Sequence, residues 1–364
     1  MITEAADATF DPSQIPSQET SDPRLLVRDP VVSVTMITYN HAPWVGQAIE
    51  SILAQECGFP FELVVAEDCS TDATRAIVLD YQRRYPKIIR VITSAHNVGV
   101  KRNVWRAHRA CRGRYIAACE GDDYWHHRRK LQKQVEVLED HPEYGLVHSD
   151  CDVFLVRTGR TIRSQNRAGG RIPCEGQDLF TSILTGRYKI RTASVCARKE
   201  LLDRVQASDP VLFRSDRFPM GDTPTWLELS RLTRFRYLDE SLATYRVLSE
   251  SASQSDDVQK VIRFEKACYK LREYFMDKYG CDAKTRREVV KIWQCRLADL
   301  AFKAADVELA RQAWAELERE GIDVGFAGHV KRWATAPGLV NTLARAVQYH
   351  TRPLRARNRY FSRY

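Results

Sequence analysis

The sequence predicts an α/β fold with a mostly parallel sheet and a smaller helical appendage, and three observations predict it. Apolar, β-branched runs alternate with runs of helical periodicity over roughly the first third of the chain. Each apolar run ends in polar residues, as expected for strands that deliver side chains to one edge of a sheet. The chain of 364 residues, 44% hydrophobic and 28% charged, is long enough for one large core and an appended unit.

The expected strands and helices alternate in chain order. The strands are expected at residues 31–40, 61–68, 87–94 and 114–123, and the helices at residues 41–55, 69–86 and 100–113. Strands joined by helices of this length pair in parallel, because each crossover returns the chain to the same end of the sheet. The strand ends TYN, EDCSTD and EGDD therefore meet at one edge, where such sheets bind their ligands.

The chain divides into four segments by composition. Residues 1–30 are polar and carry Pro, Ser and Asp without periodicity, which predicts a flexible leader. Residues 31–255 form the α/β domain. Residues 256–325 have helical periodicity and predict three helices, and residues 326–364 form a basic amphipathic tail.

This tail carries most of the net charge of +9. Between His329 and Tyr364 there is no Asp or Glu, and Lys and Arg interleave with aromatic and aliphatic residues. The pattern is typical of segments that lie on a membrane surface. Binding of residues 329–364 to an anionic membrane surface and loose packing on the protein body are equally favoured interpretations. RNA is a less favoured third, so we do not expect nucleic acid as a partner.

The ten cysteines are scattered, without a C-x-x-C pair or a metal-type spacing, so reduced thiols are expected. The N-terminal stretch MITEAADATF has neither the basic nor the apolar region of a secretory signal. No uncharged apolar stretch approaches the ~18 residues that a membrane span needs. We therefore expect a cytoplasmic protein, peripheral at the inner face of the cell membrane if the tail binds there.

The stretch EGDDYW places three carboxylates directly behind an apolar strand. Glu120, Asp122 and Asp123 repel one another there and are costly to desolvate unless a cation lies among them. A solvated, capped turn is the alternative interpretation.

Four motifs in register resemble the nucleotide-sugar domain of family 2 glycosyltransferases with the GT-A fold. They are VSVTMITYN, ELVVAEDCSTDAT, HNVGVKRN and GRYIAACEGDDYW. The resemblance covers residues 31–155 well, as a nucleotide-sugar half, and residues 156–255 more loosely, as an acceptor half. It implies an inverting transfer, in polysaccharide biosynthesis, from a UDP-linked or dTDP-linked sugar donor to a hydroxyl group. The acceptors left open are a glycan, a lipid-linked glycan and a protein.

The resemblance also implies a divalent cation, Mn²⁺ or Mg²⁺, because oxygen ligands hold such ions against a departing diphosphate. Asp123 is implied as the main metal ligand, and Asp122 as a metal ligand or ribose contact. The family's usual D-x-D-D has Glu120 at its first position here, which leaves the role of Glu120 open. The His that often follows Tyr-Arg in the family is absent after Arg246, so no third protein ligand is expected from that loop.

By the same resemblance, the tips of the first two strands bind the nucleotide, and Asp68 accepts a hydrogen bond from a uracil or thymine N–H. Arg246 is expected to clamp phosphate, with Lys101 in a phosphate or ribose contact or, equally, at a solvated helix start. The full set of expected donor-binding residues is Thr38, Tyr39, Asn40, Glu67, Asp68, Asn97, Lys101, Asn103, Asp122 and Arg246.

Asp222, in RFPMGDTPTW, corresponds to the family's catalytic carboxylate and is expected to act as the general base, with an N-cap as the alternative. Two other functions stay open. A nucleotidyltransferase would use a similar sheet and metal, but HAPWVGQA is neither Gly-rich nor basic. A non-catalytic nucleotide-binding, glycan-binding or membrane-surface scaffold would not need Asp123 or Asp222.

Overall fold

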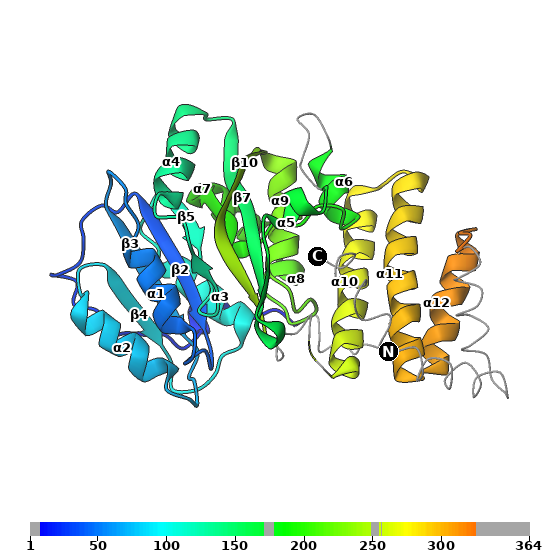
Figure 1. Cartoon of the computed structure of the whole chain (residues 1–364), viewed down its shortest axis with the longest axis horizontal. Coiled ribbons are helices and arrows are strands. Elements are labelled where there is room, and N and C mark those ends of the chain that lie inside the picture. Colours follow the sequence, from blue (N-terminus) through cyan, green and yellow to red (C-terminus); the bar gives the residue numbers. More distant parts are fainter. Residues whose placement is uncertain (1–7, 171–177, 249–254, 256, 325–364) are drawn as a thin grey trace. The chain divides into compact units, whose positions relative to one another are not determined.

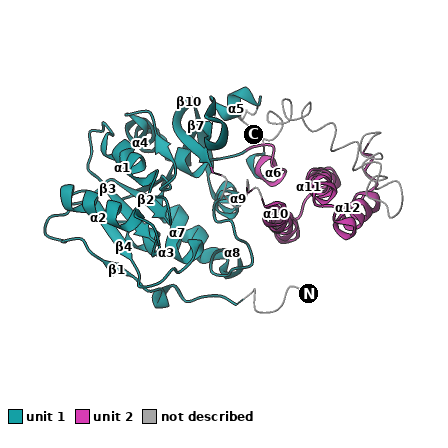
Figure 2. Cartoon of the chain, turned by 60° about the horizontal axis from the view of Figure 1, so that its bottom comes forward, with its two compact units in different colours: residues 1–180, 189–247 teal, residues 181–188, 248–364 magenta. Residues whose placement is uncertain are grey.

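The computed structural model describes residues 8–170, 178–248, 255 and 257–324. The chain forms two compact units, coloured separately in Figure 2. Unit 1 comprises residues 1–180 and 189–247, and unit 2 comprises residues 181–188 and 248–364. The basic tail expected at residues 326–364 lies outside the described residues.

Unit 1 is built on one large sheet, visible in Figure 1. Its strands lie in the order β1-β4-β3-β2-β5-β9-β7-β10-β6, with β8 paired to β7. The four strands expected from the sequence are present and pair in parallel: β2 (Val32–Thr38), β3 (Phe61–Glu67), β4 (Ile89–Thr93) and β5 (Tyr115–Ala118). The helices expected between them are α1 (Val45–Leu53), α2 (Thr74–Arg84) and α3 (Val100–Ala110). The α/β prediction is confirmed.

The second half of the sheet is mixed. Strand β9 runs antiparallel to β5 and β7, β10 runs parallel to β7, and β6 runs antiparallel to β10. The bounds of its strands are β6 (Tyr124–Trp125), β7 (Tyr144–Leu155), β8 (Arg160–Ile162), β9 (Val195–Arg198) and β10 (Arg234–Val247). The helices of this half are α4 (Lys130–Asp140), α5 (Gln165–Ala168), α7 (Lys199–Ser208), α8 (Pro210–Phe213) and α9 (Asp222–Leu232), whereas α6 (Leu179–Leu184) belongs mostly to unit 2.

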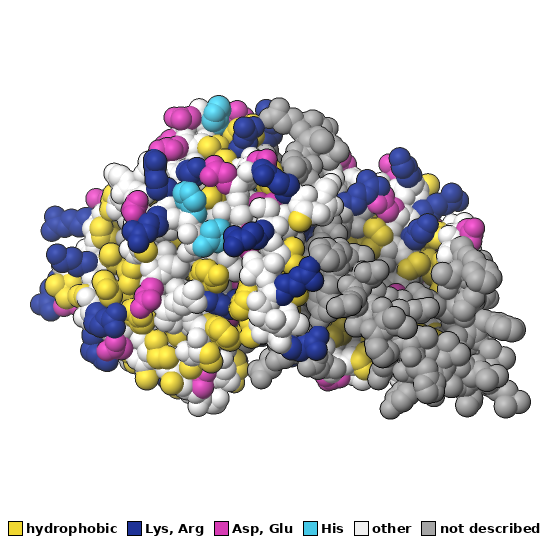
Figure 3. Space-filling view, in the orientation of Figure 1, with side chains coloured by type: hydrophobic (Ala, Val, Ile, Leu, Met, Phe, Trp, Pro, Cys, Tyr) yellow, Lys and Arg dark blue, Asp and Glu magenta, His cyan; other side chains and the backbone are white. Residues whose placement is uncertain are grey.

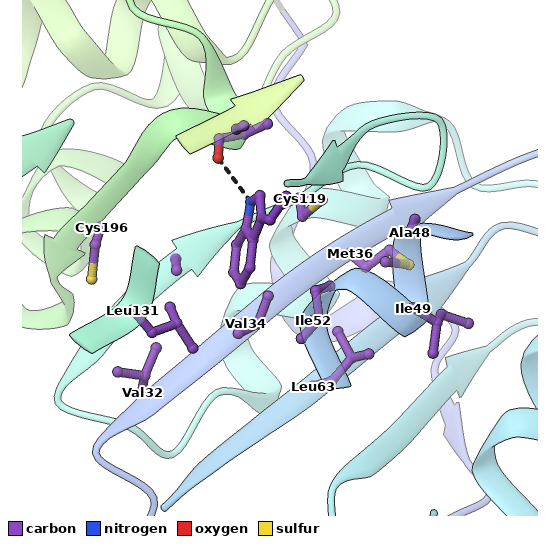
Figure 4. Close-up of a cluster of buried hydrophobic side chains, with 14 of the residues drawn as sticks. Val32, Val34, Met36, Ala48, Ile49, Ile52, Leu63, Cys119, Leu131 and Cys196 are labelled. Atoms are coloured by element: carbon purple, nitrogen blue, oxygen red, sulfur yellow. Dashed lines mark hydrogen bonds between the residues drawn. The ribbon is translucent and has the colours of Figure 1, made fainter. Parts of the chain in front are cut away.

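Helices cover both faces of the sheet, with α1 and α4 on one side and α3 and α7 on the other in Figure 2. Alternate residues of β2 face α1, so Val34 and Met36 pack against Ile49 and Ile52, all fully buried (Figure 4). Burying each such side chain contributes about 1.5–3 kcal/mol. Strand β3 is buried along almost its whole length, as a parallel strand covered on both faces must be.

The prediction of a flexible leader is wrong for residues 8–30. Strand β1 (Gln18–Glu19) pairs antiparallel with β4, and Glu19 forms an ion pair with Arg90 over 2.8 Å. The Phe10 N–H donates to the Arg214 carbonyl over 2.7 Å. Main-chain hydrogen bonds and an ion pair hold this segment at the sheet edge, and such contacts leave no apolar periodicity in the sequence.

Unit 2 contains the three helices expected after residue 256, namely α10 (Val258–Tyr279), α11 (Ala283–Ala304) and α12 (Val307–Arg319). Each begins behind an aspartate whose side chain accepts a main-chain N–H of the first turn: Asp257, Asp282 and Asp306. Unit 1 ends at residue 247, where β10 ends. Among the described residues, no helix is both long and apolar enough to span a membrane.

Candidate active site

The polar tips of neighbouring strands meet at one edge of the sheet. Strands β3, β2 and β5 are adjacent and parallel, so their carboxyl ends lie side by side. The tips of β2 and β3 are also bonded together. The Oδ1 atom of Asn40 accepts the Thr71 N–H over 2.9 Å, and the Asn40 N–H donates to Ser70 Oγ over 3.0 Å. Asn40 has φ 55°, a left-handed conformation that Asn tolerates better than most residues.

Behind β5 lies the carboxylate loop, residues 119–123, with Glu120, Asp122 and Asp123. One oxygen of each carboxylate lies within 4.8 Å of the others. Burial, followed by the charges of Asp122 and Asp222, raises the pKa of Glu120 to about 8. Burial, followed by the charges of Asp122 and Glu120, raises the pKa of Asp123 well above its ordinary value. Carboxylate oxygens are the hard donors that Mg²⁺ and Mn²⁺ prefer, and a cation would relieve the repulsion among these three groups, so this set fits a divalent cation.

The glycine of the carboxylate loop is required by close packing. A Cβ atom on Gly121 would lie 2.5 Å from Thr38 Oγ1 and 2.9 Å from His41 Nδ1. Both of these atoms are buried and have no hydrogen-bond partner within the described residues. The loop therefore rests directly on the tip of β2.

Arg246 makes its contacts within the protein. The guanidinium was predicted to clamp phosphate, but it is buried and holds the protein itself. Its Nη1 donates to the Asp122 carbonyl over 2.5 Å, and its Nη2 donates to Gln47 Oε1. The rings of Trp44 and Tyr124 lie 5.0 and 4.5 Å from its Cζ atom. These contacts hold the Arg246 guanidinium against the carboxylate loop, and its expected contact with a phosphate stays a prediction.

Lys101 and Asn103 point into the protein instead of toward the ligand edge. The Lys101 ammonium donates to the carbonyl oxygens of Leu212 and Ser215 over 2.9 and 2.7 Å, and burial lowers its pKa to about 8. The Asn103 Nδ2 donates to the Ala66 carbonyl over 2.9 Å. Both residues lie on the buried side of α3, because this helix covers the sheet with a polar face as well as an apolar one. We therefore leave both out of the donor site.

Glu67 and Asp68, at the end of β3, both accept main-chain hydrogen bonds and form ion pairs with arginines. The Asp68 carboxylate accepts the N–H groups of Val98 and Gly99 over 2.9 and 3.1 Å, and it pairs with Arg106 over 3.2 Å. Glu67 is fully buried, accepts the Ser70 N–H over 2.6 Å and pairs with Arg75. Glu67 thus shapes the loop. Asp68 is also buried, and its carbonyl accepts the Nδ2–H of the exposed Asn97 over 3.0 Å.

Asp222 is the first residue of α9 and is exposed. The helix N-cap is Gly221, and the Asp222 carboxylate accepts the N–H of Thr223 over 2.6 Å. The N-cap alternative is therefore wrong. The charge of Asp222 is one of those that raise the pKa of Glu120, so Asp222 lies near enough to the carboxylate loop to act on it electrostatically.

Sequence reasoning missed two residues at this site. His41 Nε2 lies 4.0 Å from Asp122 Oδ2. The Arg191 Cζ atom lies 4.2 Å from the centre of the Tyr245 ring, and Arg191 Nε donates to Gln165 Oε1 over 3.0 Å. The positive charge of Arg191 lowers the pKa values of Glu120 and Asp123 and so partly offsets the effect of burial. His41 directly follows the strand end TYN, so its place near the site could have been predicted from the sequence. No motif around Arg191 indicates a place beside the carboxylate loop.

Comparison with protein families finds a match of residues 33–191 to glycosyl transferase family 2. The chain is 44% identical over 169 residues to the uncharacterized protein Rv1520 of Mycobacterium tuberculosis, which is 46% of this chain and 47% of that protein. The chain thus spans about half the length of that relative. It is 34% identical over 280 residues to the uncharacterized glycosyltransferase EpsJ of Bacillus subtilis, covering 73% of this chain and 75% of EpsJ.

Among solved structures, the mannosyltransferase PcManGT of Pyrobaculum calidifontis, in complex with GDP-Man and Mn²⁺, resembles the chain with a TM-score of 0.53. The sequences are 17% identical, and the alignment covers 96% of this chain and 86% of that one. At this identity the likeness concerns the fold, which is the GT-A fold that the motif order implied. The family match to residues 33–191 and the identity with EpsJ over three quarters of its length show that the chain belongs to glycosyltransferase family 2.

Proposed function

We propose that the protein is an inverting glycosyltransferase that moves a sugar from a nucleoside-diphosphate donor, UDP-linked or dTDP-linked, to an acceptor hydroxyl group. The observation that carries the proposal is the set of three carboxylates within 4.8 Å of one another, placed behind β5 beside the tips of β2 and β3. Ligands of parallel sheets bind at this edge. The GT-A relative PcManGT, which binds GDP-Man and Mn²⁺, supports the donor class.

The nucleotide would lie over the ends of β2 and β3. Tyr39 is 41% exposed, so its ring is free to cover a base or ribose. Asp68 Oδ2 accepts one N–H, from Gly99, and keeps capacity for an imide N–H of uracil or thymine. Asn97 and Asn40 border the same tip, and their amides suit ribose hydroxyl groups.

Asp123 and Asp122 would hold Mn²⁺ or Mg²⁺, with Glu120 close enough to complete the carboxylate set. When bound, the cation would neutralise the negative charge that develops on the departing diphosphate. The protein contributes oxygen donors at fixed positions: the Asp123 Oδ1 atom accepts the Arg246 N–H over 2.8 Å. This bond leaves the other Asp123 oxygen for the ligand.

Asp222 is proposed as the general base. Its carboxylate takes the proton of the acceptor hydroxyl while the acceptor oxygen attacks the anomeric carbon of the donor sugar. The bond from that carbon to the diphosphate oxygen breaks, and the diphosphate leaves with the electron pair. Attack from the face opposite the leaving group inverts the anomeric configuration. Because Asp222 begins α9 in the acceptor half, it can face the acceptor while the carboxylate loop faces the donor.

A glycan, a lipid-linked glycan or a protein is the proposed acceptor, and polysaccharide building is the proposed setting. The putative teichuronic acid biosynthesis glycosyltransferase TuaG of Bacillus subtilis, 26% identical over 269 residues, supports this setting. A cytoplasmic site of action at the membrane surface, reached through residues 329–364, would suit a lipid-linked acceptor. On the face of the molecule in Figure 3, Lys and Arg side chains lie among Asp and Glu instead of forming one basic patch.

The testing experiment is a thermal-shift panel of nucleoside diphosphates, each with and without Mn²⁺. We expect one pyrimidine diphosphate to raise the melting temperature only when Mn²⁺ is present. An Asp123→Asn variant should lose the shift, and an Asp140→Asn variant, changed at the exposed end of α4, should keep it. If no nucleotide stabilises the parent protein at millimolar concentration, the donor site is refuted.

A further inference from the structure

We propose that three residues of the β2–α1 segment act as positioning residues for Asp122. They are His41, Trp44 and Gln47, spaced three apart, and are called the β2–α1 brace below. The inference rests on the proposed function, since Asp122 matters there as a ligand of the cation and donor. Neither the expected metal ligands nor the expected nucleotide contacts include these three residues.

The His41 ring lies close to the carboxylate of Asp122. Its Nε2 lies 4.0 Å from Asp122 Oδ2, close enough for electrostatic attraction and for a hydrogen bond after a small shift. The other ring nitrogen, Nδ1, is buried against Gly121 and has no partner within the described residues. Nε2 is therefore the nitrogen that faces the site. The imidazole is wedged between Gly121 and Asp122, so its position and that of the carboxylate depend on each other.

Trp44 and Gln47 contact Arg246, which in turn bonds the main chain of Asp122. The guanidinium of Arg246 donates to the Asp122 carbonyl over 2.5 Å, and it also donates to Gln47 Oε1. The Trp44 ring covers one face of the guanidinium at 5.0 Å. Removing the Gln47 acceptor frees one arm of the fork, and the arm that holds Asp122 then loses its fixed direction.

The brace is itself anchored at both of its ends. The Ala42 N–H donates to Asp72 Oδ2 over 3.1 Å, and the Trp44 N–H donates to the His41 carbonyl over 2.9 Å. Beyond Trp44 the segment enters α1, whose Val45 and Ala48 are fully buried. One short, rigid segment thus holds Asp122 at its carboxylate and at its carbonyl.

Residues that orient a metal ligand without touching the metal commonly change metal affinity by 10-fold to 100-fold when replaced. We therefore expect His41→Ala to weaken Mn²⁺ binding about 10-fold in the presence of the stabilising nucleoside diphosphate. His41→Gln, whose amide N–H can take the place of Nε2–H, should recover most of that loss. Gln47→Ala should weaken Mn²⁺ binding as well, because Gln47 is exposed and acts only through Arg246.

The measurement is Mn²⁺ titration of the full chain followed by electron paramagnetic resonance of the free ion, with the diphosphate present throughout. The matched control is His96→Ala, which removes an exposed imidazole and should leave Mn²⁺ affinity unchanged. The melting temperature without metal and nucleotide is recorded for every variant. We expect it to stay within about 2 °C of the parent value for Gln47→Ala, as for other exposed substitutions.

The outcomes separate this inference from the proposed function. If the parent binds no Mn²⁺ with any diphosphate, the proposed function fails and this inference fails with it. If the parent binds Mn²⁺ and the His41 and Gln47 variants bind equally well, only the brace is refuted. Lower melting temperatures with unchanged Mn²⁺ affinity would likewise refute it, because the segment would then serve packing alone.

Discussion

Arg246 bonds to both aspartates of the carboxylate loop through different atoms. Its main-chain N–H donates to Asp123 Oδ1 over 2.8 Å, and its Nη1 donates to the Asp122 carbonyl over 2.5 Å. One residue of β10 therefore fixes a loop that lies more than a hundred positions earlier in the chain. The second half of the sheet thus supports a loop of the first half, so the two halves are expected to lose stability together.

Replacing Arg246 by lysine should test this support. Lysine keeps the charge and the main-chain N–H, but a single ammonium cannot reach both the Asp122 carbonyl and Gln47. We expect the free energy of unfolding to fall by about 2–3 kcal/mol, since one buried acceptor loses its donor. Denaturant unfolding checks the value. Arg311→Lys, an exposed replacement in α12, is the control and should change stability by less than about 0.5 kcal/mol. Equal losses in both variants would contradict the assignment.

Gly121→Ala should damage the site through packing. The new Cβ would lie 2.5 Å from Thr38 Oγ1 and 2.9 Å from His41 Nδ1, so the carboxylate loop must move. We expect Mn²⁺ affinity in the presence of the diphosphate to fall at least about 10-fold, because ligand positions matter within a fraction of an ångström. Isothermal calorimetry measures it. At Gly58 a Cβ would meet no atom closer than 3.8 Å, so Gly58→Ala should bind normally. Normal binding by Gly121→Ala would show that the loop tolerates displacement.

His148 should make stability depend on pH. Burial lowers its pKa to about 4, whereas the unfolded chain binds the same proton near pH 6.5. Stability is therefore complete above pH 6.5 and falls as the pH decreases from 6.5 to 4, by about 3 kcal/mol in total. Urea unfolding across this range compares the parent with His148→Phe, which cannot titrate and should lack this part of the loss. An exposed control, His96→Phe, should follow the parent. Parallel curves for the parent and His148→Phe would disprove the buried neutral imidazole.

The order of strands and helices from β2 to β5 was predictable because the apolar runs and helical periods of this part of the chain are uninterrupted. The carboxylate loop was predictable as well, since EGDD follows such a run. The partners of charged side chains were not. Lys101 and Arg246 have the residue types that phosphate contacts use, but burial and neighbouring carbonyl groups give them structural roles. Arg191 shows the converse, because its approach to the carboxylates depends on the packing of β9 against β5 and β7.

Asp222→Asn should separate binding from chemistry. Asparagine has the same shape and can keep the contact with the Thr223 N–H, so the fold and the donor site should be preserved. It cannot take the acceptor proton, and we expect kcat to fall by about 10²–10⁴, the usual contribution of a general base. The Mn²⁺-dependent thermal shift with the nucleoside diphosphate should stay at the parent value. Turnover is measured as release of the diphosphate from the donor sugar that the thermal-shift panel identifies. Asp216→Asn, an exposed change in the preceding loop, should retain activity. Parent-level turnover by Asp222→Asn would assign the base to another residue, and a lost thermal shift would place Asp222 in the donor site instead.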